Sequence, residues 1–304
     1  MKNILKHITD VGSAFGAGID SNIRIEKQYE KLGIVPKVIP AGHSPLHVAF
    51  AACTELSKKA ENNVQKILKD LNIIIEEKSP IALNSAPRNS AKSQDDGQED
   101  HIYKISFSNK EVFLIYGFEV LRWVLEFYND ENTKIERIIS IKDVIPDTSK
   151  GSQFRSAEHL PIVHFLEFKK ELNNYGEIET IQKESIQKNF ENKETEIIIA
   201  PPDEYGNGRL IVDKILLEKI LNKKSIKIPT ITSKELPVKE SLTEITPGEL
   251  SIWISSNHFP NKNLKVLNIG TRWKEKTTKT TSTDTIELVK RLSSKIGESH
   301  KIIL

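Results

Sequence analysis

The pattern of apolar residues changes once along this chain, near residue 190, and that change limits the folds it can adopt. Before it, short apolar runs alternate with longer amphipathic stretches; the longest, residues 46–71, has apolar residues three and four positions apart, as a helix requires. After it, short strand-like runs are separated by Pro, Gly and Asn. We therefore expect an α/β N-terminal domain over residues 1–190 and a smaller all-β, barrel-like C-terminal domain over residues 191–304.

The same pattern predicts individual elements in each half. Further helices are expected at 118–128 and 158–172. Strands are expected at 4–10, 72–75, 80–83, 112–115 and 135–144, and then at 196–200, 209–212, 225–228, 249–255 and 264–267. Residues 85–100 have almost nothing to bury and predict a mobile loop, whereas the charged, Gln- and Asn-rich residues 176–196 predict a linker.

Charge and cysteine content argue against several classes of function. With 44 basic and 42 acidic residues, the chain lacks the cationic excess that phosphate-backbone binding needs, so nucleic acid is not an expected partner. The single cysteine, Cys53, allows neither an intramolecular disulfide nor a Cys-based zinc site, and its apolar helical surroundings predict a core thiol. No run reaches the roughly 20 apolar residues of a membrane span, so we expect a cytoplasmic protein with no membrane partner.

Asp10 lies at the end of the first predicted strand, ahead of a turn rich in glycine and alanine. A carboxylate in this place can accept two hydrogen bonds from the hydroxyls of a ribose, as acidic residues do in dinucleotide folds. It can equally serve as a turn or N-cap residue. The glycine spacing matches neither a P-loop nor a Rossmann fingerprint, so the local pattern leaves both interpretations open.

Three polar segments near the ends of predicted strands in the second half could also bind a ligand. Residues 202–208 suit a hairpin turn or a ligand loop, and residues 254–258 and 264–272 carry hydroxyls and amides that could bind an amino acid or a base edge, or cap turns. Elsewhere, His43 and His47 are four apart near a helix start, but no third ligand is in view. No metal site is therefore expected.

The order of these segments carries more information than any one of them. The chain resembles the S-adenosyl-L-methionine hydroxide adenosyltransferases and the related fluorinases and chlorinases over roughly residues 4–272. The matching segments are Ile8-Thr9-Asp10-Val11-Gly12, Ile39-Pro40, Ala49-Phe50-Ala51-Ala52, Val112-Phe113-Leu114, residues 121–125, residues 152–161, Asp203-Glu204-Tyr205-Gly206-Asn207, Ile254-Ser255-Ser256 and residues 264–270.

The resemblance implies an α/β N-terminal domain, a smaller β-barrel C-terminal domain, and a homotrimer whose ligand lies between the N-domain of one subunit and the C-domain of the next. In such proteins water or halide attacks the ribose C5′ of S-adenosyl-L-methionine and displaces methionine. The sulfonium is already an activated leaving group, so the reaction needs no metal or other cofactor. Positioning and desolvation of the nucleophile would supply the rate.

By position, the resemblance assigns six ligand-binding residues to this chain: Asp10, Asp203, Asn207, Ser255, Ser256 and Asn268. The first aspartate would hold the ribose hydroxyls and the second the methionine amine. The two serines would contact the methionine carboxylate. Asn207 would hydrogen-bond adenine or the amino acid, and Asn268 would lie beside the adenine pocket.

The hydrolytic positions of the family are replaced. The Asp-Pro-Gly turn corresponds to residues 83–88, and the Phe-His-Gly-Arg-Asp run corresponds to residues 153–158. Arg88, Arg155 and Glu158 are the nearest polar substitutes and become the candidate catalytic residues. Two functions therefore follow from the resemblance: an S-adenosyl-L-methionine hydrolase or C5′-adenosyltransferase with a changed catalytic set, or a trimeric adenosyl-binding module without turnover that serves as a sensor or structural subunit.

Overall fold

Two compact units make up the chain, Met1–Asn189 and Phe190–Leu304. The computed structural model describes residues 4–9, 17–42, 44–55, 79–85, 101–149, 155–186, 195–202, 207–271, 288 and 290–303, with the backbone alone for residues 4, 17–21, 55 and 155. Within these residues the protein is of the mixed α/β class and has two seven-stranded sheets, one of which curls into a half-barrel.

The first unit contains one of these sheets and the helices that pack on it. Its elements are β1 (Ile4–Thr9), α1 (Ala17–Lys31), β2 (Val35–Pro40), α2 (Pro45–Glu55), β3 (Ile81–Asn84), β4 (Ile102–Ser106), β5 (Val112–Tyr116), α4 (Phe118–Tyr128), β6 (Lys134–Ile141), α5 (Arg155–Phe168), α6 (Leu172–Tyr175), β7 (Gly176–Ile181) and the 3-10 turn η1 (Lys183–Ser185).

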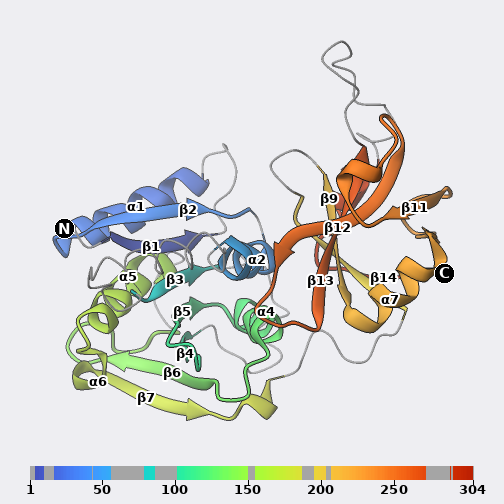
Figure 1. The fold of residues 1–304 in the computed structure, drawn as a ribbon. Helices are drawn as coiled ribbons and strands as arrows, with labels where there is room; N and C mark the ends of the chain where they lie inside the picture. The colour runs from blue at the N-terminus through green and yellow to red at the C-terminus, as the bar shows by residue number, and fades with distance from the viewer. Residues whose placement is uncertain are drawn as a thin grey trace, which may run out of the picture. The chain divides into compact units, whose positions relative to one another are not determined.

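The strand order of this sheet is β2-β1-β3-β5-β4-β6-β7, which Figure 1 shows as a continuous series. Strands β2, β1, β3 and β5 are parallel, whereas β4, β6 and β7 pair antiparallel. Side chains alternate between the two faces of a strand, so Leu5 packs with Ile25 of α1 and Ala157 of α5. On the other face, Phe113 of β5 contacts Tyr128 of α4. The sheet is therefore covered on both faces, as parallel strands require.

Several first-unit elements differ from the sequence-based expectations. The predicted linker at 176–196 is wrong over Gly176–Ile181, which form the edge strand β7; its polar alternation reflects an edge position beside β6. Strand β2 was not predicted because it contains Pro36 and Pro40, which an edge strand tolerates. Helix α2 is described only to Glu55, so the rest of the predicted 46–71 helix lies outside the described residues. Cys53 is fully buried, which confirms the predicted core thiol, and burial raises its pKa.

The second unit is built on the other sheet. Its elements are β8 (Glu196–Ala200), β9 (Gly208–Asp213), α7 (Lys214–Lys223), β10 (Ser225–Lys227), β11 (Glu235–Lys239), the 3-10 turn η2 (Leu242–Glu244), β12 (Leu250–His258), β13 (Leu264–Thr271) and β14 (Ser299–Lys301). Strands were predicted at the positions of β8, β9, β10, β12 and β13. The expectation of strands alone is wrong, because residues 214–223 form α7, which starts at the N-cap Asp213.

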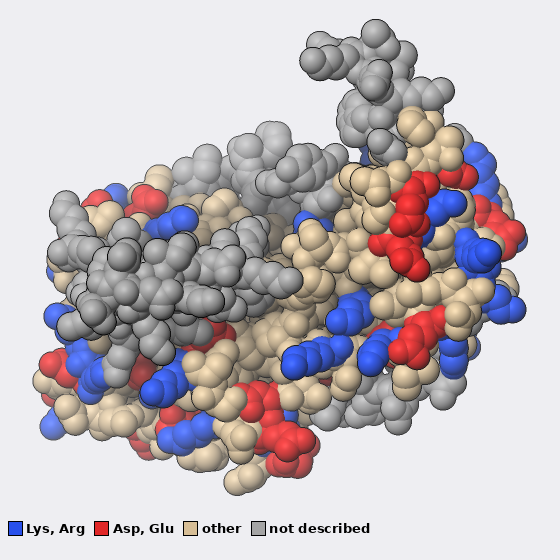
Figure 2. Space-filling model, in the orientation of Figure 1, with Lys and Arg blue, Asp and Glu red and all other residues tan. Residues whose placement is uncertain are grey.

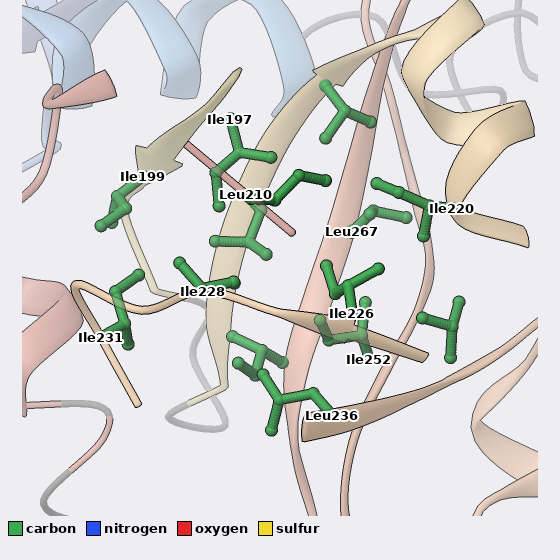
Figure 3. Close-up of a cluster of buried hydrophobic side chains, with 14 of the residues drawn as sticks. Ile197, Ile199, Leu210, Ile220, Ile226, Ile228, Ile231, Leu236, Ile252 and Leu267 are labelled. Carbon is green, nitrogen blue, oxygen red and sulfur yellow. The ribbon is translucent and has the colours of Figure 1, made fainter. Parts of the chain in front are cut away.

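The sheet of the second unit curls so that one bridge connects the ends of its two edge strands. Its strand order is β10-β11-β12-β13-β9-β8-β14, and an antiparallel bridge joins Lys227 at the end of β10 to Ile303 beyond β14. The two residues exchange backbone hydrogen bonds of 3.0 and 2.9 Å. Figure 3 shows part of the apolar core that this curvature encloses, which includes Ile199, Leu210 and Leu267.

In the described part of the chain, each helix is too short or too polar to pass through a bilayer.

A chain of polar side chains crosses the core of the first unit. The hydroxyl of Tyr29 in α1 lies 3.1 Å from Nδ1 of His7 in β1 and 2.5 Å from Nδ1 of His164 in α5. Nε2 of His164 lies 2.8 Å from the carbonyl oxygen of Pro80. All three side chains are fully buried. Burial lowers the pKa of His7 to about 3, with a further contribution from His164, and lowers the pKa of His164 to about 4.

These pKa shifts predict a loss of stability in acid. Below pH 6.5 the unfolded chain binds protons at both histidines, whereas the folded chain keeps them neutral until about pH 4. The free energy of unfolding should therefore fall by roughly 3 kcal/mol per histidine between these limits and should not change above them on their account. Urea unfolding at a series of pH values measures this slope.

His7→Phe should reduce the dependence of the free energy of unfolding on pH, because the unfolded variant has one histidine fewer to protonate. Phe113→Leu, at a fully buried side chain of the same sheet that does not titrate, is the control and should leave the slope unchanged. A wild-type protein whose unfolding free energy is constant over this interval would contradict the buried, neutral state of the pair.

Candidate functional site

The carboxyl ends of β1 and β3 meet at the place where the parallel sheet changes direction. Strand β2 lies on one side of β1 and β3 lies on the other, so the chain leaves β1 and later returns on its opposite side. Ligands of open α/β sheets bind at such a switch point, outside the carboxyl ends of the strands. Here the last residues of the two strands, Thr9 and Asn84, are register partners.

Thr9 and Asn84 form a buried polar pair at this edge. Both are almost fully buried, and Nδ2 of Asn84 donates to Oγ1 of Thr9 over 3.4 Å. Oδ1 of Asn84 is buried and has no hydrogen-bond partner among the residues that the structure describes. An unpaired buried acceptor costs about 1–3 kcal/mol, so its presence indicates a place for a hydrogen-bond donor from outside the protein.

The next strand brings its backbone close to the same edge. Asn84 is the register partner of Tyr116 at the end of β5, and the amide of Ser85 donates to the carbonyl of Tyr116 over 3.3 Å. Gly117 follows with a φ of 108°, and a Cβ there would lie 2.4 Å from the carbonyl oxygen of Ser85. Only glycine permits this approach, which lets β5 turn directly into α4 beside Ser85.

The structure describes only some of the predicted site residues of the first unit. Asp10 follows Thr9 directly in the sequence but lies, with Arg88, outside the described residues. Arg155 is the first residue of α5, and its side chain is not described. Glu158 of α5 forms an ion pair of 3.7 Å with Arg24 of α1, the two side chains being 33% and 47% exposed. Among the described atoms, none of the candidate catalytic residues Arg88, Arg155 and Glu158 is therefore in contact with another.

The second unit has a polar row on the sheet face opposite its apolar core. Ala200, Arg209, Asn268 and Trp253 are successive register partners across β8, β9, β13 and β12. Residues directly opposite one another share a face, and the alternation places Ile252 on the core side. Oδ1 of Asn268 and Oγ of Ser251 are buried without a hydrogen-bond partner among the described groups.

Asn207 joins this face through Gly270. A Cβ at Gly270 would lie 2.3 Å from Oδ1 of Asn207 and 3.2 Å from the ring of Trp253. The amide of Asn207 therefore lies over the glycine, next to the indole. Two of the six residues that the resemblance assigns to ligand binding are thus near one another in the sheet: Asn268 lies on β13, and Asn207 directly precedes its partner strand β9.

The remaining predicted residues of the second unit lie at the end of β12. The pairing of β12 with β13 shifts register between Ile254 and His258, which surrounds Ser255 and Ser256. Ser255 is buried and its Oγ accepts from the amide of Asn257 over 3.2 Å, whereas Ser256 is exposed. Asp203 lies outside the described residues.

The chemistry of these groups suits a partly aromatic ligand that forms hydrogen bonds. Amides and hydroxyls donate and accept hydrogen bonds, and an aromatic ring such as Trp253 offers a flat apolar surface. His47, which was considered as a metal ligand, has its Nδ1 2.7 Å from Oγ of Ser44, and His43 lies outside the described residues. Over the described ranges, no group of three or more His, Cys, Asp or Glu side chains could hold a metal ion.

Surface charge is mixed on the face shown in Figure 2. Lys and Arg side chains of the described residues lie interspersed with Asp and Glu side chains. Such a surface does not produce the one-sided field that steers highly charged ligands.

Sequence reasoning did not identify Asn84, His7 or Trp253. Asn84 could have been found by the signal that drew attention to Asp10, a polar residue at the end of an apolar strand. His7 was hidden because its partners, Tyr29 and His164, are distant in the sequence, and Trp253 because a strand tryptophan is ordinarily part of a core.

Comparison with known proteins identifies no family for the chain. No family model matches it, and no curated protein matches it. It is similar to a solved structure described as "Crystal structure of uncharacterized conserved protein from Thermotoga maritima", with a TM-score of 0.55 and 16% sequence identity, covering 99% of this chain and 100% of that chain. At this identity the similarity shows the fold alone.

The Arg24–Glu158 ion pair predicts that Glu158→Gln changes stability little. Both side chains are partly exposed, and ion pairs that reach solvent contribute about 0–1 kcal/mol. Thermal unfolding should therefore give nearly the same midpoint as the wild type. Glu119→Gln, which removes the exposed pair with Arg122 on α4, is the matched control and should behave alike. A large drop for Glu158→Gln alone would make this carboxylate a structural residue and remove its value as a catalytic candidate.

Proposed function

We propose that the protein binds S-adenosyl-L-methionine and that water attacks the ribose C5′, releasing methionine and adenosine. The observation that carries the proposal is the buried Thr9–Asn84 pair at the switch point of the parallel sheet, with an acceptor that has no partner among the described residues. Asp10, the residue that the resemblance assigns to the ribose hydroxyls, follows this pair directly in the sequence.

The polar face of the second unit supports recognition of adenine. Asn207 and Asn268 offer amide groups to the edge of a base, and Trp253 offers an aromatic surface beside them. Under this proposal Ser255 and Ser256, at the irregular end of β12, receive the methionine carboxylate. Asp203 receives the methionine amine.

The finer fold assignment is part of the same proposal. Residues 1–190 act as an α/β adenosyl-binding domain and residues 191–304 act as a small β-barrel domain. A homotrimer would bring the strand-end edge of one subunit to the polar face of the next. Each face would then supply one part of the ligand site.

A second candidate function is an adenosyl-binding trimer that has lost turnover. It is favoured by the pairing of Glu158 with Arg24, because this ion pair engages the carboxylate of one candidate catalytic residue. In this case the protein serves as a sensor or a structural subunit. The two functions share the ligand and differ in whether the C5′–sulfur bond breaks.

Isothermal titration of the full chain with S-adenosyl-L-methionine, and separately with adenosine, tests both functions when the recovered ligand is analysed by chromatography. The proposed hydrolase binds S-adenosyl-L-methionine and returns adenosine and methionine in equal amounts. The lapsed module binds and returns the ligand intact. Absence of binding to either compound would refute the adenosyl assignment.

Gly270→Ala tests the adenine face. The added methyl group would displace the amide of Asn207, a flexible side-chain end, so the free energy of unfolding should change by less than about 1 kcal/mol. The affinity for adenosine should fall about tenfold, the value of roughly one hydrogen bond.

Asn207→Ala should cause the same loss of affinity, measured by the same titration. Because both changes remove one interaction, the double variant should bind no more weakly than either single variant. Additive losses would mean that Gly270 and Asn207 act independently, which the contact between them does not allow.

A further inference from the structure

The hydrogen positions along the buried His7–Tyr29–His164 chain follow from one fixed acceptor. The carbonyl oxygen of Pro80 can only accept, so Nε2 of His164, 2.8 Å away, carries a hydrogen. In a neutral imidazole Nδ1 is then bare and accepts the single hydroxyl hydrogen of Tyr29 over 2.5 Å. The oxygen of Tyr29 in turn accepts from Nδ1 of His7 over 3.1 Å.

The last step of this series determines the tautomer of His7. Because its Nδ1 carries the hydrogen, its Nε2 is an unprotonated acceptor. This nitrogen is fully buried and has no hydrogen-bond partner within the described ranges. A buried lone pair of this kind needs a donor, and none of the described protein groups supplies one.

His7 and Asn84 lie close together on one face of the sheet. His7 and Thr9 alternate on the face covered by α1 and α5, and their register partners on β3 are Ala82 and Asn84. A strand spacing near 4.8 Å and a rise near 3.3 Å per residue place the Cα atoms of His7 and Asn84 roughly 8 Å apart. The other two residues of this patch are the small side chains of Ala82 and Thr9, the second of which accepts the Nδ2 hydrogen of Asn84 and leaves Oδ1 as the unpaired atom.

We propose that His7 and Asn84 together hold the water molecule that attacks C5′, a role that rests on the proposed hydrolysis of S-adenosyl-L-methionine. A water molecule has two hydrogens, and the site has two unpaired acceptors, Nε2 of His7 and Oδ1 of Asn84. A water that donates both hydrogens keeps its oxygen lone pairs for a third partner. Asn84 is the last residue of β3 and His7 lies two residues before the end of β1, at the edge of the sheet where the ligand is proposed to bind.

The reaction balances with these groups alone. The water oxygen forms a bond to C5′ while the C5′–sulfur bond breaks, and that bonding pair becomes the second lone pair of the methionine sulfur. One water hydrogen passes to Nε2 of His7 and the other remains on the new 5′-hydroxyl. The proton on His7 is later released to solvent, so one water and one sulfonium yield adenosine, methionine and one proton.

A weakly basic imidazole is sufficient for this step. The attacking oxygen becomes strongly acidic as it bonds to carbon, so it gives up its proton to a neutral nitrogen even though burial lowers the pKa of His7 to about 3. The chain can then move the charge: His7 passes its Nδ1 hydrogen to Tyr29, and Tyr29 passes its own to Nδ1 of His164. The positive charge thereby moves away from the reacting centre.

The test compares ligand binding and single-turnover rate in two variants of the full chain. His7→Phe removes the nitrogen at similar volume, and Asn84→Leu removes the amide at similar shape. Each should lower the rate of methionine release by on the order of 100-fold and leave the dissociation constant for S-adenosyl-L-methionine within about twofold. His101→Phe, at a buried histidine that bonds Thr148, is the matched control and should retain the wild-type rate.

The outcomes separate this role from the proposed function. If the wild type turns over and both His7→Phe and Asn84→Leu are as fast as His101→Phe, the water site is overturned. The proposed hydrolase activity is then retained. A loss of affinity equal to the loss of rate would also overturn it, because the pair would then bind the ligand and not the nucleophile. If the wild type binds S-adenosyl-L-methionine but releases no product, both the proposed hydrolysis and the water site are overturned. If His7→Phe does not fold, Asn84→Leu decides the question by the same two measurements.

Discussion

The parallel pairing of β1 with β3 determines which side chains meet at the centre of the first unit. In the observed register Thr9 lies opposite Asn84 and His7 lies opposite Ala82. Side chains alternate along a strand. If β1 were shifted by one residue relative to α1 and α5, His7 would point to the other face and Lys6 would enter the core. The buried polar chain, the strand-end pair and the proposed water site all depend on this register.

Helix α5 is held to the same sheet by polar groups at two levels. His164 bonds to Tyr29 and to the carbonyl of Pro80, and one turn further along Glu167 pairs with Lys104 of β4 over 2.9 Å. Lys104 also lies 3.7 Å from its register partner Glu136, and all three side chains are largely buried. Buried charges contribute less to stability than to specificity, because a helix placed one turn away would leave them unpaired.

The sequence predicted best those elements whose signal is local. Apolar strands such as β8 were identified at their observed bounds because the whole run is buried. Edge strand β7 and helix α7 were missed for a different reason: β7 is half polar, and α7 carries the exposed apolar residue Ile215 besides its buried side, so neither shows a clear period. In α7 the cap at Asp213 and the buried Leu216 and Ile220 were the available signal.

The candidate site could be predicted only in part. Asn207 and Asn268 were assigned through the resemblance, and the structure places both on the polar side of one sheet. His7 was not assigned, because its role depends on hydrogen positions that propagate from Pro80 through two other elements. No local pattern contains that information, since each of the partners is contributed by a separate part of the chain.

The bridge between Lys227 and Ile303, together with the pairing of β14 with β8, also bears on how the second unit forms during synthesis. Strand β8 is the first strand of this unit to leave the ribosome, and its partner β14 is the last. Until β14 appears, β8 has an open hydrogen-bonding edge on one side, which is the kind of surface that aggregates or recruits chaperones. The half-barrel of the second unit is therefore completed only when β14 has been synthesised, whereas the parallel strands of the first unit can pair while the chain is still growing.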